Sequence, residues 1–386
     1  MTTGVRWLSV GPGNGYGDAG EAYRAGLRAA GVPVSWTPLG WPSPIWNAPH
    51  GPLEQAPANG VPHGGPANRA IEHDTVVVHS PPLWHPQLVS EADGRLLVAC
   101  TTWETDRLPD DWVDILNRYD RVLVPSRFNA AVFERSGVHP PVHVVPHIVR
   151  RSRRAPLPPQ TSDTFVFYLI ATWTSRKAIL DAVSAFVRAF TGDDRARLVI
   201  QTTRVDHIAA AQLQRSGTPQ PPAARETWFS LARALAGHRS VPAITLGTRL
   251  LARHEIDALH DRCDCFLLLS HGEGWGLGAF EAAAAGNPVI VTGWGGTLSF
   301  LPDGYPYCVD YDLVPTVTAP PDSWWGPRPG ERWANARIEH AAALLRHVFE
   351  HREEARGWGR ALQLHVRACF SPTRVTQALL GALECR

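Results

Sequence analysis

The sequence predicts an α/β fold with two domains, each built on a parallel β-sheet. Short apolar runs of strand length alternate with helical patterns along most of the 386 residues, and this alternation is typical of parallel sheets. The chain is also long for a single hydrophobic core. The basic, proline-rich stretch Arg150–Pro159 separates two halves that repeat the order strand, loop, helix. We interpret it as a solvated linker at the domain boundary, with contact to an anionic surface as the alternative.

The composition excludes several classes of protein. The formal net charge of +1 at pH 7 gives no bulk attraction toward nucleic acid or anionic membranes. No apolar run reaches the roughly 18–20 residues that a membrane span needs, and the N-terminus lacks the form of a signal peptide. The six cysteines show no zinc or redox spacing. We therefore expect a soluble, cytoplasmic protein with reduced thiols, without a nucleic-acid partner and without a stable membrane anchor.

The first domain is expected over residues 1–152. Its strands are predicted where short apolar runs are bounded by polar or turn residues. These runs are Val5–Val10, Thr75–Val78, Leu96–Ala99, Arg121–Pro125 and Val142–Val145. Helical patterns are found at Ala19–Ala30, at Asp111–Asn117 and from a cap at Ser126–Asn129 to Ser136. A strand, a glycine loop and a helix in this order form half of a Rossmann-like domain.

The glycine loop Gly11–Asp18 follows the first predicted strand. In one interpretation, the backbone around Gly13, Gly15 and Gly17 presents N–H groups at the helix start to a phosphate or a sugar hydroxyl. In the other, the loop is a tight strand-to-helix turn whose Asp18 caps the helix.

A second loop, Gly40–Asn68, is crowded with proline and glycine and carries Trp41 and Trp46. Loops of this length in a compact domain are usually functional or disordered. Tryptophan faces stack on sugar and other ring surfaces, which favours a lid or an acceptor-binding loop over a plain linker. The alternative is that these aromatic side chains form a small satellite core.

The stretch Thr101–Pro109 follows the predicted strand Leu96–Ala99 and is therefore expected at the carboxyl edge of the first sheet, where ligands bind in such folds. Glu104 is its candidate functional residue. The alternative for Glu104 is a structural capping role.

The second domain is expected over residues 153–370. Its predicted strands are Thr164–Ile170, Arg197–Thr202, Ile244–Leu246, Cys265–Ser270 and Pro288–Thr292. Helices are predicted from Ser175, over Arg253–His260 and from Ala334 onward, and a last helix, beyond this domain, over Pro372–Cys385.

Arg176 and Lys177 are expected in the first turn of the helix that opens at Ser175, whose apolar positions repeat at helical spacing. Cations in that turn oppose the helix dipole unless an anion is nearby. Their position therefore favours a bound phosphate, against the alternative of ordinary surface charge.

The stretch Ser270–Glu281 is predicted to be a strand end, a glycine-loosened loop and the first turn of a helix. It carries two carboxylates, Glu273 on the loop and Glu281 on the helix. Glycines here let the backbone approach a ligand that a Cβ would exclude. The two glutamates are therefore expected to face a pocket, and taken alone they could suggest the acid–base pair of a hydrolase.

Several motifs together resemble the retaining, nucleotide-sugar-dependent glycosyltransferases of family 4. The motifs are Glu273-x7-Glu281 within Ser-x-x-Glu-Gly-Trp-Gly-Leu, then Glu-Ala-x-Ala-x-Gly-x-Pro-Val-Ile, and also Trp103–Pro109, Val124–Phe128, Val144–His147 and Arg176-Lys177. The resemblance covers most of the chain. It implies the GT-B architecture of two Rossmann-like domains facing across a cleft, with residues 371–386 forming a helix that crosses back to the N-terminal domain.

The resemblance also implies a role for each matching residue. Glu281 would accept hydrogen bonds from the donor ribose, and Glu273 with the backbone of Gly274, Trp275, Gly276 and Leu277 would hold the donor sugar and its phosphate. Arg176 and Lys177 would neutralise the departing diphosphate. Thr248 and Arg249 lie near the family's nucleobase position, and the Gly13–Gly17 loop would close on the phosphates or the acceptor from the other domain.

The sequence departs from the family pattern at two places. Ile170-Ala171 stands where many members have a Gly-Arg pair, so Arg176 would have to supply the arginine role. The cleft histidine that many members carry after a strand like Leu96–Ala99 has no evident replacement in Thr101–Glu104. Within the resemblance, Glu104 is the candidate for contacting an acceptor hydroxyl or a donor sugar. The single D-x-D, Asp310–Asp312, lies outside the motif cluster, and we expect neither a metal nor another cofactor.

The leading functional hypothesis is transfer of a sugar from a nucleotide diphosphate-sugar to a hydroxyl of a natural product or saccharide. Family resemblance implies retention of configuration without an enzymic nucleophile, the departing phosphate taking the acceptor proton. The alternatives are a nucleotide-sugar epimerase or glycosyl phosphorylase on the same fold, and a catalytically silent protein that binds sugar nucleotides.

Overall fold

The computed structural model of the protein describes residues 2–39, 71–82, 85, 94–150, 163–216, 222–316 and 328–384. The expected loop Gly40–Asn68 lies outside the described residues, as does the linker segment Arg151–Pro159. The chain divides into two compact units. Unit 1 comprises Met1–Val149 and Cys369–Arg386, and unit 2 comprises Arg150–Ala368.

Unit 1 contains a parallel sheet in the strand order β2-β1-β3-β4-β5-β6. The strands are β1 (Val5–Ser9), β2 (Val34–Pro38), β3 (Thr75–His79), β4 (Leu96–Cys100), β5 (Arg121–Val124) and β6 (Val142–Val144), and the helices are α1 (Gly15–Ala29), α2 (Asp110–Leu116), α3 (Arg127–Arg135) and α11 (Pro372–Glu384). Ser9 is in register with His79, and His79 with Cys100. The carboxyl ends of β1, β3 and β4 therefore form one edge.

Helix α1 begins at Gly15, four residues before the predicted start, and Asn14 is its cap. The Asn14 side chain accepts a hydrogen bond from the Gly17 N–H at 3.0 Å. The proposed capping role of Asp18 is therefore wrong, because Asp18 lies inside the first turn and accepts from the Gly13 N–H instead. A Cβ on Gly17 would lie 1.7 Å from the Gly11 carbonyl oxygen, so only glycine allows the loop to pass this close to the helix.

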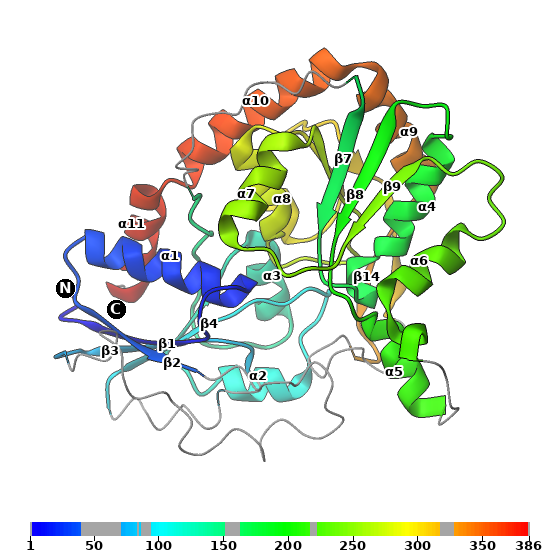
Figure 1. The fold of residues 1–386 in the computed structure, drawn as a ribbon. Helices are drawn as coiled ribbons and strands as arrows, with labels where there is room; N and C mark the ends of the chain where they lie inside the picture. Colours follow the sequence, from blue (N-terminus) through cyan, green and yellow to red (C-terminus); the bar gives the residue numbers. More distant parts are fainter. Residues whose placement is uncertain are drawn as a thin grey trace. The chain divides into compact units, whose positions relative to one another are not determined.

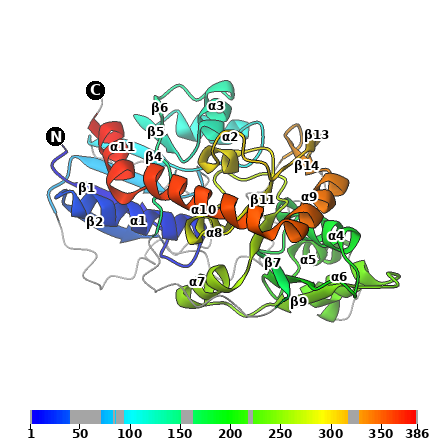
Figure 2. The ribbon, with the colours of Figure 1, turned by 90° about the horizontal axis from the view of Figure 1, so that it is seen from above.

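The final helix, α11, packs against α1 within unit 1, as the two views show (Figures 1 and 2). Backbone contacts anchor it: the Val149 N–H donates to the Phe370 carbonyl at 2.8 Å. Arg121 donates to the Ala382 carbonyl, also at 2.8 Å. The end of the chain is thus part of the first structural unit.

Unit 2 contains a second parallel sheet, in the order β12-β11-β10-β7-β8-β9, and a separate antiparallel pair, β13-β14. Its strands are β7 (Phe165–Ile170), β8 (Ala196–Gln201), β9 (Ala243–Gly247), β10 (Cys265–Leu268), β11 (Val289–Thr292), β12 (Cys308–Val309), β13 (Tyr311–Pro315) and β14 (Arg332–Ala336). Its helices are α4 (Ile179–Ala189), α5 (His207–Ser216), α6 (Thr227–Leu235), α7 (Arg253–Arg262), α8 (Leu277–Ala285), α9 (Ile338–Glu350) and α10 (Arg352–Cys369). Helices α7 and α8 lie on one face of the sheet and α4 and α9 on the other (Figure 1). The two helix-covered parallel sheets confirm the predicted α/β class.

The predicted helix from Ala334 onward starts later than expected. Ala334 lies in β14, and α9 begins only at Ile338. The segment Arg332–Ala336 pairs with β13, and this tertiary pairing overrides the helical composition of the residues that follow.

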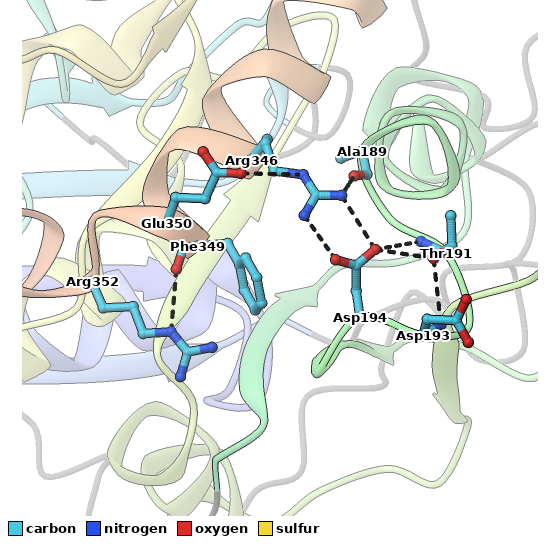
Figure 3. Close-up of polar contacts among 8 residues, drawn as sticks. All are labelled: Ala189, Thr191, Asp193, Asp194, Arg346, Phe349, Glu350 and Arg352. Carbon is cyan, nitrogen blue, oxygen red and sulfur yellow. Dashed lines mark hydrogen bonds and ion pairs between the residues drawn. The ribbon is translucent and has the colours of Figure 1, made fainter.

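Helix α9 is fastened to the end of α4 by Arg346 (Figure 3). The Arg346 guanidinium lies 2.8 Å from Asp194 Oδ1, donates to the Ala189 carbonyl, and stacks over the Phe190 ring. This contact lowers the pKa of Asp194. Next to it, the Arg352 side chain donates to the Phe349 carbonyl and covers the Phe349 ring. The α4–α9 layer is therefore fixed by charged groups as well as by apolar packing.

The opposite layer depends on a close contact between α8 and α10. Helix α8 ends at Gly286, which has a left-handed φ of +101°. Gln363 and Arg367 of α10 both donate to the Ala284 carbonyl, at 3.1 and 2.9 Å, and so satisfy a carbonyl in the last turn of α8. A Cβ on Gly359 of α10 would lie 2.2 Å from the Gly286 carbonyl oxygen.

Two glycines of α10 should therefore respond in opposite ways to alanine. Gly359→Ala should lower the free energy of unfolding by about 1–3 kcal/mol, because the new methyl group meets rigid backbone. Gly357→Ala should raise it by up to about 1 kcal/mol, because alanine favours helix and the nearest heavy atom to that Cβ is 4.0 Å away. Urea unfolding of the two variants measures both effects. Equal stability of the two variants would contradict this account.

Candidate functional site

The predicted site residues around Glu273 lie where three adjacent strands of the unit 2 sheet end. The loop Ser270–Gly276 follows β10, the 3₁₀ helix Ser175–Lys177 follows β7, and the glycine loop Gly293–Gly296 follows β11. Because β11, β10 and β7 are neighbours and parallel, these segments share the edge at which ligands bind in open α/β sheets.

Glu273 is the centre of this edge and is only 7% exposed. The Lys177 ammonium lies 2.5 Å from its Oε1, and Arg176 Nη1 lies 3.3 Å from its Oε2. Burial alone would raise the pKa of Glu273, but Lys177 and Arg176 outweigh it and lower this pKa to about 2. The carboxylate therefore remains ionised at neutral pH and does not fit the role of a general acid.

Arg176 and Lys177 reach Glu273 from a different local structure than the sequence predicts. They lie in the 3₁₀ helix, and α4 begins only at Ile179. Between the two stands Ala178, with φ +46°, the single non-glycine residue of positive φ in the described ranges. The expectation that both cations occupy the first turn of α4 is thus wrong, because this left-handed residue breaks the helix, and the argument from the helix dipole no longer applies.

The glycines around Glu273 allow two loops to touch through their backbones. The Gly296 N–H donates to the Glu273 carbonyl at 2.7 Å, and a Cβ on Gly296 would lie 1.8 Å from the Gly274 carbonyl oxygen. Gly276 has φ +84° and precedes α8, so no side chain caps the first N–H groups of that helix. Leu277 is the first residue of α8.

Trp275 is a core residue. It is 3% exposed, and its ring packs against Phe280 and Phe300 with centroid distances of 5.2 and 5.6 Å. A contact from Trp275 to a ligand would therefore come from the backbone.

Glu281 lies one turn into α8, with a side chain that is 16% exposed. Arg253 of α7 holds its Oε1 at 2.5 Å and is itself paired with Asp257 at 2.8 Å. His260 of α7 places Nε2 3.8 Å from Oε2. Burial alone would raise the pKa of Glu281, but His260 and Arg253 lower it. Like Glu273, Glu281 is thus a stabilised anion.

Thr248 and Arg249 follow β9, the edge strand that β7 and β8 separate from β10. Arg249 is paired with Glu255 through both oxygens, at 2.5 and 3.0 Å. The cation that contacts Glu281 is instead Arg253, which the sequence analysis did not select. No local pattern marks Arg253, because its partner lies 28 residues further along the chain.

The other predicted residues belong to unit 1. The Gly13–Gly17 segment and Glu104 lie beyond the ends of β1 and β4. The Tyr16 hydroxyl lies 3.1 Å from Thr101 Oγ1 and links the two segments. Burial raises the pKa of Tyr16, and the Glu104 carboxylate raises it further. Glu104 is therefore close to the start of α1, and its role toward a ligand stays a prediction.

The neighbours of Glu104 in its motif are structural. Trp103 is 2% exposed and donates to Thr105 Oγ1 and to the Arg107 carbonyl. Asn129 of α3 donates to the Trp103 carbonyl at 2.6 Å. The motif thus fixes the loop after β4, and Glu104 and Asp106 are its two partly exposed carboxylates.

One buried histidine at the edge of unit 1 was not selected from the sequence. His79 ends β3 and is enclosed by the rings of Trp7, Tyr16 and Tyr23. Burial lowers its pKa well below the usual value, so the ring is neutral at pH 7. In the sequence, His79 directly follows the apolar run Thr75–Val78, and this position at a strand end could have marked it as a candidate.

The described residues contain no group of three or more His, Cys, Asp or Glu side chains arranged to hold a metal ion. Asp310 and Asp312 lie in separate contacts, with His340 and Arg337 respectively. Among the helices that the structure describes, none is long and apolar enough to cross a membrane.

The ion pair of Glu273 should appear in the acid stability of the protein. Because its pKa is about 2 in the folded state against a usual 4.5, the pair should contribute roughly 3 kcal/mol above pH 4.5. That contribution should be lost as the pH falls toward 2. Urea unfolding should therefore show a stability gap between the wild type and Glu273→Gln that narrows from pH 6 to pH 3.

Asp163→Asn is the control, because Asp163 forms an ion pair with Arg195 in which both side chains are more than two-thirds exposed and solvent screens the charges. The free energy of unfolding of this control variant should differ little from that of the wild type at every pH. A Glu273→Gln gap that stays constant over this range would contradict the buried ion pair.

Comparison with known proteins identifies the fold and the family. Sucrose-phosphate synthase from Thermosynechococcus elongatus is 15% identical, with a TM-score of 0.64 over 98% of each chain. A structure described as trehalose-6-phosphate from E. coli bound with UDP-2-fluoro glucose is 12% identical, with a TM-score of 0.62 over 99% of each chain. A mutant of S. aureus TarM, in complex with fondaparinux, alpha-GlcNAc-glycerol and UDP, is 12% identical with a TM-score of 0.55. That match covers 81% of this chain but spans only 55% of the length of TarM.

These likenesses show the GT-B type of α/β fold. No curated protein matches the sequence. The profile of a family described as family 4 glycosyltransferase in conflict systems matches residues 123–379, more than half of the chain. The chain therefore belongs to the family 4 glycosyltransferases in conflict systems.

Proposed function

We propose that the protein transfers a sugar from a nucleotide diphosphate-sugar to an acceptor hydroxyl, with retention of the anomeric configuration. The observation that carries this proposal is the cluster of Arg176, Lys177 and Glu273 beside the uncapped start of α8. Two cations and a helix N-terminus at one sheet edge suit a diphosphate. The adjacent Glu281 suits the hydroxyls of a ribose.

Each part of the donor would meet a different group of the cluster. The ribose hydroxyls donate to the Glu281 carboxylate, and each such charge-assisted hydrogen bond is worth roughly 1.5–3 kcal/mol. The diphosphate shares Arg176 and Lys177 with Glu273, and these cations stabilise the negative charge that grows on the leaving group. Glu273 and the backbone of Gly274 and Gly276 then border the donor sugar.

The chemistry of Glu273 supports a reaction without an enzymic nucleophile. Both of its oxygens are held by cations, which weakens the carboxylate as a nucleophile. In the proposed reaction the acceptor hydroxyl attacks the anomeric carbon as the bond to the diphosphate breaks. The departing phosphate oxygen takes the acceptor proton on the same face, so the configuration is retained.

The donor and acceptor classes follow from weaker observations. Structures of TarM and of the E. coli protein contain UDP and UDP-2-fluoro glucose, so uridine diphosphate sugars are the first donors to test. We propose a saccharide or ring-bearing natural product as the acceptor. We further propose that side-chain cations replace a divalent ion. The five described cysteines are all free thiols, and this supports the proposal of a cytoplasmic protein.

Two substitutions should separate binding from turnover. After a thermal-shift screen of nucleotide sugars has identified a donor, Glu281→Ala should weaken its binding by roughly 10- to 100-fold, the loss of a charge-assisted hydrogen bond. Lys177→Ala should lower kcat by roughly 100-fold or more, since it removes leaving-group stabilisation. Titration calorimetry measures the first effect, and product formation at saturating donor measures the second.

Arg188→Ala is the control, because Arg188 forms an exposed pair with Glu339 and should leave both quantities unchanged. Full activity in the Glu281 and Lys177 variants would refute the site. Consumption of donor without acceptor, giving an epimerised nucleotide sugar, would favour the epimerase alternative.

A further inference from the structure

Behind Glu281 a chain of buried polar groups runs from Asn287 through Tyr168 to His260. Asn287 follows the end of α8, Tyr168 lies in β7 and is fully buried, and His260 lies near the end of α7 and is 3% exposed. These three side chains come from separate elements. Which group donates and which accepts in each of their hydrogen bonds can be determined from the chemistry of the groups.

The direction starts at the Asn287 amide. Its side-chain nitrogen lies 2.6 Å from the His260 backbone carbonyl. A carbonyl oxygen can only accept, so the NH2 group of Asn287 must point there. The same nitrogen lies 2.8 Å from the Tyr168 hydroxyl oxygen, which therefore accepts the second hydrogen of the amide.

The Tyr168 hydroxyl passes this direction to His260. Its oxygen lies 2.8 Å from His260 Nδ1, and burial raises the pKa of Tyr168 well above its usual value, so the hydroxyl keeps its proton. If Nδ1 carried a hydrogen, the Tyr168 proton would have no acceptor among the described groups, at the cost of a buried unsatisfied donor. Nδ1 is therefore the acceptor, and a ring proton lies on Nε2.

That N–H lies near the proposed ribose-binding carboxylate. Nε2 has no hydrogen-bond partner among the described residues and lies 3.8 Å from Glu281 Oε2. An N–H at this position attracts the carboxylate, whereas a bare nitrogen lone pair would repel it. Arg253 holds the other oxygen from a more open position, with a side chain that is 37% exposed.

We propose that His260 is a positioning residue of the donor site, held as the Nε2–H tautomer by Asn287 and Tyr168 so that it orients Glu281 toward the ribose. This inference rests on the proposed function, in which Glu281 binds the ribose hydroxyls. His260 is the inner, enclosed partner of the carboxylate, and Arg253 is the outer partner that a ribose can displace or share.

The tautomer is tested directly by nitrogen NMR of the full-length protein labelled at histidine, with the His260 signals assigned by their loss in His260→Gln. The expected result is a proton on Nε2 and none on Nδ1. A proton on Nδ1 would overturn the inference. In Tyr168→Phe the preference for Nε2–H should weaken, because Nδ1 loses its hydrogen-bond donor.

The effect on binding is tested with UDP and 2′,3′-dideoxy-UDP, the second of which lacks the hydroxyls that Glu281 would bind. The wild type should prefer UDP, and Tyr168→Phe should reduce this preference by roughly tenfold while affinity for the dideoxy compound stays nearly unchanged. A general loss of structure would weaken both ligands equally. GDP and ADP with their dideoxy forms replace the uridine pair if UDP does not bind.

A pair of His260 variants provides the matched control. The side-chain amide of His260→Gln can reach the place of Nε2 and should retain part of the preference for ribose hydroxyls. The shorter His260→Asn reaches only the place of Nδ1 and should lose it. If the wild type binds UDP more tightly than 2′,3′-dideoxy-UDP and all three variants show the same affinity ratio, the role of His260 is refuted while the proposed function stands. If the wild type makes no distinction for any base, the ribose role of Glu281 itself fails.

Discussion

The buried carboxylate of Glu273 is the constraint on which the rest of the site depends. An anion at this depth is costly unless cations reach it, and both cations come from the single turn Ser175–Lys177. The turn is joined to α4 through Ala178 in the left-handed region, a conformation that costs an alanine roughly 1–2 kcal/mol. On the other side, Gly274 and Gly296 meet without side chains. Strain and close backbone packing are thus concentrated around one charge, as is common where a fold holds a functional group in place.

Much of the fold could be predicted because buried parallel strands are continuous apolar runs. Strands β3, β4, β7, β10 and β11 are such runs, and each was expected within about two residues of its observed ends. The sequence also places Glu273 and Arg176-Lys177 directly after strands, while the structure shows that these strands, β10 and β7, are neighbours. Strand β2 was not expected, because its residues are half-exposed and carry serine, threonine and proline. Its place in the sheet depends on pairing with β1.

The parts of the site that could not be predicted depend on contacts between elements. The sequence Ser175-Arg176-Lys177 continues smoothly into the apolar pattern of α4, and nothing local marks Ala178 as left-handed. Trp275 stands among glycines, and its burial depends on Phe300 beyond the next strand. His260 and Arg253 face Glu281 only because α7 packs beside α8. Spacing along the chain can indicate which residues share an edge, but it cannot determine which side chains oppose each other across two helices.

The close contact between Gly286 and Gly359 links the inner wall of the site to a helix far along the chain. Gly286 directly precedes Asn287, and Gly359 lies within 3 Å of Pro288 by the position its Cβ would occupy. Helix α10 therefore packs directly against the backbone on both sides of Asn287, whose side-chain amide forms the first hydrogen bonds of the polar chain. A side chain at position 359 would require this backbone to move away, whereas a Cβ at position 286 would first meet the Gln363 side chain. Substitutions on α10 that look purely structural would then alter how firmly the protein holds a nucleotide.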